Sequence, residues 1–490
     1  MNAPDYHDVQ GLVRFGYGKL TEATYWLLRV RDRPAAARWL LKVPVNNAAK
    51  SDDAPETAVQ VALTLGGLKA LGTDPGITAG FSNEFLEGMA GSPNRSQRLG
   101  DVGVNDPSLW QWGYGPTMPD LLVLVFARPG KMGGWLQTLQ DADWQEGFAV
   151  VKVLETSNLF GAEPFGFKDG VSQPDVAWED APATGRDALA YRNRSALGEY
   201  VLGYSNEYGK FTDRPLTPGK AGEQRDLGRN GSYLVFRQLE QDVQGFWRYL
   251  GGQTGAVPAA ARELAAKLVG RKTDGTPLVG GGGASQNAFG YESDPIGAKC
   301  PVGAHVRRAN PRNADLVARP AWWSRLWSTL GLRAGTYNDD VMASVRFHRL
   351  LRRGREYGPP LTPEQALAAT SADQAERGIH FICLNANLSR QFEFVQGSWI
   401  MNGQFDGLPG ETDPLLGNRG RAQACPFSQF FTVRRGAGEP GRIRGLPQFV
   451  TMRGGAYFFL PGIATLRYLA GGPDCDPCLD AEGRSARLAP

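Results

Sequence analysis

The chain has 490 residues, with 53 Lys and Arg against 50 Asp and Glu, and a formal net charge of +3. A balance this close argues against a surface built to bind nucleic acid or an acidic membrane. No stretch approaches 18 consecutive apolar residues, and the N-terminus lacks a basic segment followed by an apolar run, so neither a spanning helix nor a secretory signal is predicted. We therefore expect a cytoplasmic protein of two or three domains, with a core large enough to hold a cofactor.

A strand followed by an amphipathic helix recurs along the chain. The expected pairs are 22–30 with 33–41, 120–127 with 130–142, 231–239 with 240–252, and 454–462 with 463–470. Further strands are expected at 57–65, 148–156, 344–353 and 378–386, and further helices at 259–270 and 389–402. Because several strands follow one another directly, the pattern favours an α+β protein of two related halves over one doubly wound sheet.

Polar and glycine-rich stretches separate these elements. The turn-rich stretch 195–230 is the expected junction, which predicts domains at 1–220 and 221–470 and a tail at 471–490. Four consecutive glycines make 273–305 a loop. The tail carries Cys475 and Cys478 in one CxxC, which is either half of a metal knuckle or a pair of thiols, and the five cysteines suggest no disulfide framework.

Histidine is scarce, which limits the candidates for histidine chemistry. His7 lies near the N-terminus, and His348 and His380 lie in strand-like runs that favour core or surface roles. His305 follows the glycine-rich loop and precedes the arginines of "HVRRANPR". It is either a loop histidine that caps a turn or a metal ligand beside anion-binding arginines, as in a haem site.

One acid lies in an aromatic and glycine-rich stretch, "PFGFKDGVSQP" at 164–174. Asp169 there is either the acid of an Asx-turn with structural glycines or a polar group aimed into a site. The residues around it leave both interpretations open.

Three motifs in order resemble those of the dye-decolorizing (DyP-type) peroxidase family. "GFKDG" at 166–170 resembles its GxxDG motif, "GAHVRRANPR" at 303–312 its proximal-histidine segment, and "RLLRRGREYG" at 349–358 its distal-arginine segment. The stretches 8–20, 390–399 and 449–462 resemble its opening and C-terminal segments, so the resemblance runs from about residue 8 to 470.

The resemblance implies two ferredoxin-like domains, built from antiparallel sheets with helices, and one haem b held mainly by the C-terminal half. It also implies oxidation of dyes, phenols and other aromatic donors by hydrogen peroxide. The chain is longer than the compact family pattern at about 313–343. Four aromatic residues there either relay electrons to bulky donors or pack the insertion: Trp322, Trp323, Trp327 and Tyr337.

The family's chemistry assigns three central roles. His305 would ligate the iron, Asp169 would act as acid and base toward the peroxide, and Arg352 would stabilise the developing negative charge. Arg353 is the rival to Arg352, because neighbours in a strand point to opposite faces.

Further roles concern the surroundings of the haem. Ile379 and Phe381 would form an apolar wall, with His380 on the other face of the strand. Arg307 would meet a haem propionate, with Arg308 behind it. Either Asn387 or Glu393 would accept a hydrogen bond from His305.

Two other functions compete with the peroxidase. The first is a haem-binding protein for storage, transport or iron release without significant turnover, and the second is a cofactor-free binding protein. A carrier has no need for both Asp169 and Arg352, which favours the peroxidase. The natural electron donor and the oligomeric state stay open.

Overall fold

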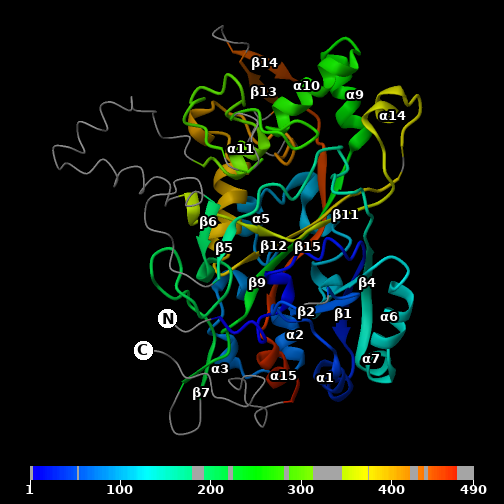
Figure 1. Cartoon of the computed structure of the whole chain (residues 1–490), viewed down its shortest axis with the longest axis vertical. Helices are drawn as coiled ribbons and strands as arrows, with labels where there is room; N and C mark the ends of the chain where they lie inside the picture. Colours follow the sequence, from blue (N-terminus) through cyan, green and yellow to red (C-terminus); the bar gives the residue numbers. More distant parts are fainter. Residues whose placement is uncertain are drawn as a thin grey trace, which may run out of the picture.

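The computed structural model describes residues 4–51, 54–178, 193–218, 224–280, 286–287, 289–312, 345–373, 375–419, 429–434 and 440–471. Within them, a nine-stranded antiparallel sheet runs through the middle of the molecule, and helices lie above and below it in Figure 1. The expected α+β class with antiparallel strands is confirmed.

The first half of the sheet comes from residues 22–155. Its elements are β1 (Glu22–Val30), α1 (Arg33–Lys42), β2 (Thr57–Leu63), β3 (Leu121–Ala127), α6 (Met132–Leu139), α7 (Ala142–Gly147) and β4 (Phe148–Glu155). The strands are ordered β2-β3-β1-β4. Asp32 starts α1, because its side chain accepts a hydrogen bond from the Ala35 amide and Pro34 follows it.

The second half repeats this arrangement. Its elements are β9 (Ser232–Gln241), α9 (Val243–Gln253), α10 (Pro258–Val269), β10 (Leu351–Arg352), β11 (Arg355–Tyr357), β12 (Gly378–Asn385), β15 (Val450–Leu460) and α15 (Ile463–Gly471). Its order, β10-β12-β9-β15, is again second, third, first, fourth, the order of a ferredoxin-like sheet. The two halves join where β15 pairs with β2, at Phe459 and Leu63.

The sheet is covered on both faces, which explains its nearly continuous apolar strands. All seven residues of β3 are buried. Val123 and Val235 belong to one core cluster, and Leu122 and Leu234 to the cluster on the other face.

Shorter elements connect the halves and cover the sheet. The helices are α2 (Leu65–Ala70), α3 (Pro75–Thr78), α4 (Asn83–Glu87), α5 (Pro93–Leu99), α11 (His305–Ala309), α14 (Pro363–Ala368), η1 (Gly11–Val13), η2 (Gly103–Asn105), η3 (Pro107–Leu109), η4 (Gly115–Thr117), η5 (Leu197–Glu199) and η9 (Phe405–Gly407). The strands are β5 (Asp175–Ala177), β6 (Arg194–Ala196), β7 (Leu216–Pro218), β8 (Gln224–Asp226), β13 (Phe430–Val433) and β14 (Gly441–Arg444).

Most strands and helices expected from the pattern are present, and two expectations need correction. The stretch 344–353 is not a strand: within its described part, only Leu351 and Arg352 pair in the sheet. The helix expected at 389–402 is two π-helical segments, η7 (Ser389–Glu393) and η8 (Val395–Ile400).

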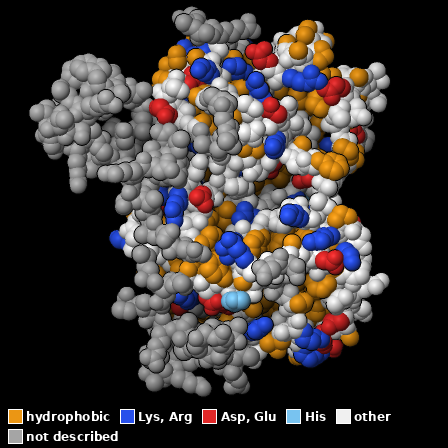
Figure 2. All heavy atoms as spheres, in the orientation of Figure 1, with side chains coloured by type: hydrophobic (Ala, Val, Ile, Leu, Met, Phe, Trp, Pro, Cys, Tyr) orange, Lys and Arg blue, Asp and Glu red, His pale blue; other side chains and the backbone are white. Residues whose placement is uncertain are grey.

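Several expectations fall outside the described residues. These are the domain boundary at 220, the insertion with Trp322, Trp323, Trp327 and Tyr337, and the tail with Cys475 and Cys478. No helix within the described ranges has the length and apolar character needed to span a bilayer. Acidic and basic side chains are interspersed on the face shown in Figure 2.

Candidate active site

A cavity lies where the segment 163–174, helix α11 and segment η8 cover the second half of the sheet. Its volume is about 280 Å³, measured as the space open to the centre of a water molecule, and its walls are mostly apolar. Asp169, His305 and Arg352 all line it. Residues far apart in the sequence are therefore brought to one cavity.

The register of three strands explains the floor of the cavity. Leu239 of β9 pairs with Ile379 of β12 on one side and Met452 of β15 on the other. Partners across an antiparallel ladder share a face, and side chains alternate along each strand. Phe381 therefore lies on the same face as Ile379, as the strand alternation predicts, and both line the cavity.

His380 lies between them in sequence and points to the opposite face. Its ring stacks on Tyr357 at 4.5 Å between centroids, and its Nε2 donates to the carbonyl of Glu155 at 3.0 Å. Burial lowers the pKa of His380 to about 4, so the ring is neutral near pH 7. His380 is therefore a core histidine, one of the two roles that the strand pattern favoured, although only Nε2 of its two ring nitrogens is hydrogen-bonded among the described residues.

The same alternation separates the two neighbouring arginines. Arg352 pairs with Cys383, which lies two positions beyond Phe381 and so on the cavity face. Arg353 points the other way, where its Nε and Nη2 donate to the carbonyls of Leu12 and Val13 at 2.7 and 2.8 Å. Arg352 lines the cavity and Arg353 does not.

Asp169 faces Arg352 from a tightly folded loop. The distance from Asp169 Oδ1 to Arg352 Nη2 is 3.5 Å, and the two side chains are 49% and 33% exposed. Gly166 and Gly170 have φ values of +95° and +74°, which residues with a side chain rarely adopt. Among the described residues, none apart from its two chain neighbours lies within 4 Å of a Cβ built at Gly170, so the positive φ is the reason for glycine there.

A second acid lies behind this loop. Glu163 accepts hydrogen bonds from the backbone amides of Phe165 and Phe167 at 3.0 and 2.9 Å, and from Gln241 Nε2 at 2.9 Å. Burial raises the pKa of Glu163 to about 7 against the effect of these hydrogen bonds, and the charge of Asp169 adds to the rise.

His305 begins helix α11 opposite the sheet. Its Nδ1 donates to Oδ2 of Asp413 at 2.9 Å, because a carboxylate can only accept. Its side chain is 25% exposed, and His305 lines the cavity. Nε2 is therefore the ring nitrogen left for another partner.

Asp413 was missed in the sequence, where Asn387 or Glu393 was expected at this position. Asn387 instead accepts from the Arg390 amide at 2.8 Å, and Glu393 accepts from Tyr457 at 2.9 Å and pairs with Arg95. Both expectations are wrong.

The Asp413 carboxylate is fully buried, and it changes the proton affinity of the imidazole. Burial lowers the pKa of His305, but the charge of Asp413 and the hydrogen bond to it outweigh that effect and leave the pKa raised. Although burial acts to raise the pKa of Asp413, His305 holds it below its usual range.

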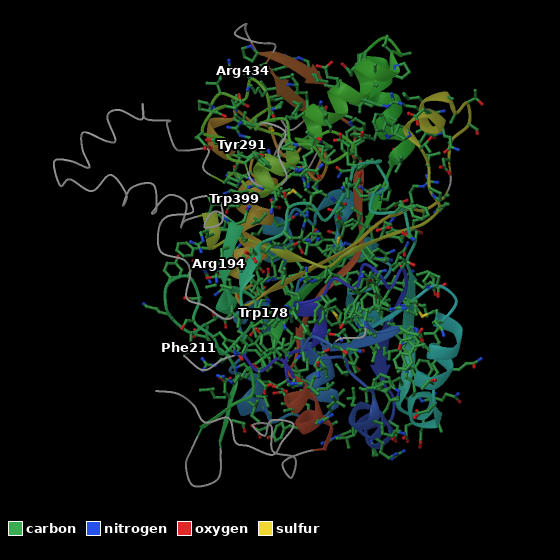
Figure 3. The ribbon with its side chains drawn as sticks, viewed as in Figure 1. Trp178, Arg194, Phe211, Tyr291, Trp399 and Arg434 are labelled. Carbon is green, nitrogen blue, oxygen red and sulfur yellow. The ribbon has the colours of Figure 1, made fainter. Side chains whose placement is uncertain are left out.

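Arg307 does not line the cavity, which corrects the assignment of a propionate partner. It is fully buried, its Nη1 donates to the carbonyls of Asp294 and Cys300 at 2.9 and 3.0 Å, and its guanidinium lies 4.6 Å from the centre of the Tyr291 ring. Arg308 is also buried, and it donates to the carbonyls of Trp399, Asn402 and Glu411. Tyr291 and Trp399 are labelled in Figure 3, in the region where Figure 1 labels α11.

Comparison with known proteins shows which family the chain belongs to. No family model matches the chain. A multifunctional dye peroxidase, DyP2, of Amycolatopsis sp. is 30% identical over 479 residues, which cover 93% of this chain and 91% of that protein. The chain belongs to the dye-decolorizing peroxidase family. It is a DyP-type peroxidase, an oxidoreductase that acts with hydrogen peroxide as acceptor.

Other members of the family agree with this assignment. The dye-decolorizing peroxidase msp1 of Mycetinis scorodonius is 28% identical and covers 84% of this chain and 76% of its own length. A crystal structure of a fungal DyP-type peroxidase from Auricularia auricula-judae has a TM-score of 0.72 at 23% identity and covers 96% of this chain and 100% of its own. An ancestral D-type dye-decolorizing peroxidase has a TM-score of 0.73 at 23% identity, with 95% and 99% covered. These structures show that the DyP-type peroxidase here shares their fold.

Proposed function

We propose that this DyP-type peroxidase uses haem b and hydrogen peroxide to oxidise dyes, phenols and other aromatic donors. The observation that carries the proposal is one cavity lined by both His305, fixed by Asp413, and the Asp169–Arg352 pair. A carrier would need the first of these features and not the second.

The residues present fit a haem. His305 would hold the iron through Nε2, because Nδ1 is engaged by Asp413, and a hydrogen-bonded carboxylate orients a histidine ligand and raises its basicity. Ile379 and Phe381 would pack against the macrocycle from the sheet. Bound haem would supply the redox chemistry, taking up the oxidising equivalents of the peroxide and passing them to the donors.

Asp169 would move the proton that peroxide cleavage requires. Its carboxylate would take a proton from one peroxide oxygen and return it to the other, which leaves as water. Arg352 would stabilise the negative charge that develops on the leaving oxygen, because a guanidinium stays charged and donates in fixed directions. The contact between them, at 3.5 Å, keeps both groups on one wall of the cavity.

The C-terminal half would hold most of the haem. His305, Arg352, Ile379 and Phe381 all come from it, whereas Asp169 comes from the N-terminal half. The N-terminal half would therefore contribute proton transfer, and the C-terminal half would contribute cofactor binding.

The test is haem loading followed by reaction with peroxide. We expect a Soret band on reconstitution, turnover of an anthraquinone dye and a phenol, and slower reaction of Asp169→Ala with peroxide, most clearly at acidic pH. A loaded protein that binds haem but turns over neither donor would favour storage or transport. Unchanged rates in Asp169→Ala would assign that residue to the turn alone.

A further inference from the structure

We infer that Glu163 is a positioning residue of the distal site, whose buried carboxyl group clamps the Asp169 loop to strand β9. The role assigned to Asp169 rests on the proposed function, whereas the clamp itself rests on geometry alone. Glu163 belongs to none of the motifs that mark the family in this sequence, and it precedes the first of them by three positions.

The hydrogen bonds of Glu163 close the loop. Its backbone amide donates to the Phe167 carbonyl at 2.8 Å, and its carbonyl accepts from the Gly166 amide at 2.8 Å. Its carboxyl group then turns inward and accepts from the amides of Phe165 and Phe167 on either side of Gly166. The main chain two residues before Asp169 is therefore held by the backbone and the side chain of Glu163.

Gln241 ties the clamp to the sheet. It is the last residue of β9, and its Nε2 donates to Glu163 Oε2, the oxygen that also accepts from Phe165. Glu163 and Gln241 both line the cavity. This hydrogen bond therefore fixes the loop relative to β9, the strand that also places Leu239 on the cavity floor.

The three partners of the Glu163 carboxyl group are all hydrogen-bond donors, so a glutamine at this position cannot accept from all of them. Oε2 accepts from the Phe165 amide and from Gln241, and Oε1 accepts from the Phe167 amide. Whichever way a glutamine amide is turned, its NH₂ group meets at least one backbone N–H, and that N–H loses its acceptor. The shape of the side chain is kept while the clamp is broken.

Other contacts hold the remainder of the loop. Trp247 Nε1 donates to the Phe165 carbonyl at 3.1 Å, and the Lys168 amide donates to Thr273 at 2.9 Å. Glu163→Gln should therefore leave the chain folded and loosen the turn next to Asp169.

The test uses haem-loaded protein at pH 8, above the pKa of about 7 at Glu163. Two quantities are measured: hydrogen exchange at the Phe165 and Phe167 amides, and the second-order rate constant for reaction with hydrogen peroxide. We expect Glu163→Gln to lower the protection of at least one of these amides by about 10-fold or more, because one hydrogen bond to a charged group is lost. The rate constant should fall by a similar factor. Glu146→Gln, on a side chain that is 61% exposed, is the matched control and should change neither.

A double-mutant cycle separates positioning from general structural damage. If Glu163 acts through Asp169, then Glu163→Gln should not slow the peroxide reaction further in an Asp169→Ala background. Gln241→Met, which removes a single donor, should give a smaller effect in the same direction. Equal slowing by Glu163→Gln in both backgrounds, or unchanged protection at both amides, would overturn the inference.

The two proposals fail in different ways. If the loaded wild-type protein does not react with peroxide, the proposed function fails, and the exchange measurement still decides whether Glu163 clamps the loop. If the protein reacts and Glu163→Gln changes nothing, only the clamp fails.

Discussion

At the scale of single residues, two identical side chains have opposite surroundings. Arg352 and Arg353 are neighbours in the chain, but the strand alternation sends the first to the cavity and the second to the carbonyls of Leu12 and Val13. The contact of Arg352 with Asp169 then pairs a fixed cation with the acid, which is the arrangement that the proposed cleavage of peroxide would use.

Arg352→Leu should keep haem binding and lower the second-order rate constant with hydrogen peroxide by about 100-fold or more, the usual cost of removing one charge-stabilising donor. Stopped-flow mixing measures this rate. Lys168→Met, which removes another cation that lines the cavity, is the control and should have a much smaller effect. Equal losses in the two variants would mean that overall charge, and not the directed contact, matters.

His305→Ala should lose haem or hold it weakly, because the other described histidine of the cavity, His348, already bonds the Arg390 carbonyl through Nδ1 and stacks on Phe394. His380 is buried on the other face of the sheet. Titration with haem, followed at the Soret band, gives the affinity. Asp413→Ala should keep the ligand and weaken binding or activity by about 10- to 100-fold, the usual effect of removing the carboxylate that orients a histidine ligand. A wild-type affinity in His305→Ala would require another iron ligand.

At the scale of elements, the site is a loop folded onto a sheet. The Asp169 loop contributes a single acid, and the sheet contributes the floor through cross-strand neighbours that share one face. At their junction, burial raises the pKa of the Glu163 carboxyl group, which gives this junction its own dependence on pH.

Unfolding should reveal that dependence. Burial raises the pKa of the Glu163 carboxyl from 4.5 to about 7 in the folded protein. Well below pH 4.5 the group is protonated in both states and adds no pH dependence, whereas above pH 7 the folded state carries a buried charge. The unfolding free energy of wild type should therefore fall relative to Glu163→Gln by about 3 kcal/mol as the pH rises from 4.5 to 7.

Chemical denaturation of both proteins at pH 5 and pH 8 measures this difference. If the difference in unfolding free energy between wild type and Glu163→Gln is the same at both pH values, the raised pKa is contradicted. A gap that moves in the opposite direction would mean that the three hydrogen bonds, and not burial, dominate the proton affinity of this carboxyl group.

At the scale of the whole molecule, two related halves share one continuous sheet, and the cavity lies on the face of the second half. The strands were predictable because long apolar runs between turn residues indicate buried strands. The expected strand at 344–353 was wrong, although the alternation of its residues fits a strand. In the structure, His348 of this stretch stacks on Phe394 at 3.8 Å and lines the cavity.

The site was predictable where short motifs carry it and not where distant residues meet. Asp169, His305 and Arg352 stand in recognisable segments, and the structure brings all three to one cavity. Asp413 lies 108 positions after His305, in a stretch without periodicity, so no local pattern could link them. Arg307 misled because closeness in sequence to His305 does not say which way a helical side chain points.

A crystal structure of the haem-loaded protein tests the central claim most directly. We predict iron bound to Nε2 of His305, with Asp169 and Arg352 facing the opposite side of the porphyrin and Asp413 still bonded to Nδ1. Iron bound by any other residue, or a haem with Asp169 and Arg352 on the same side as His305, would contradict the account.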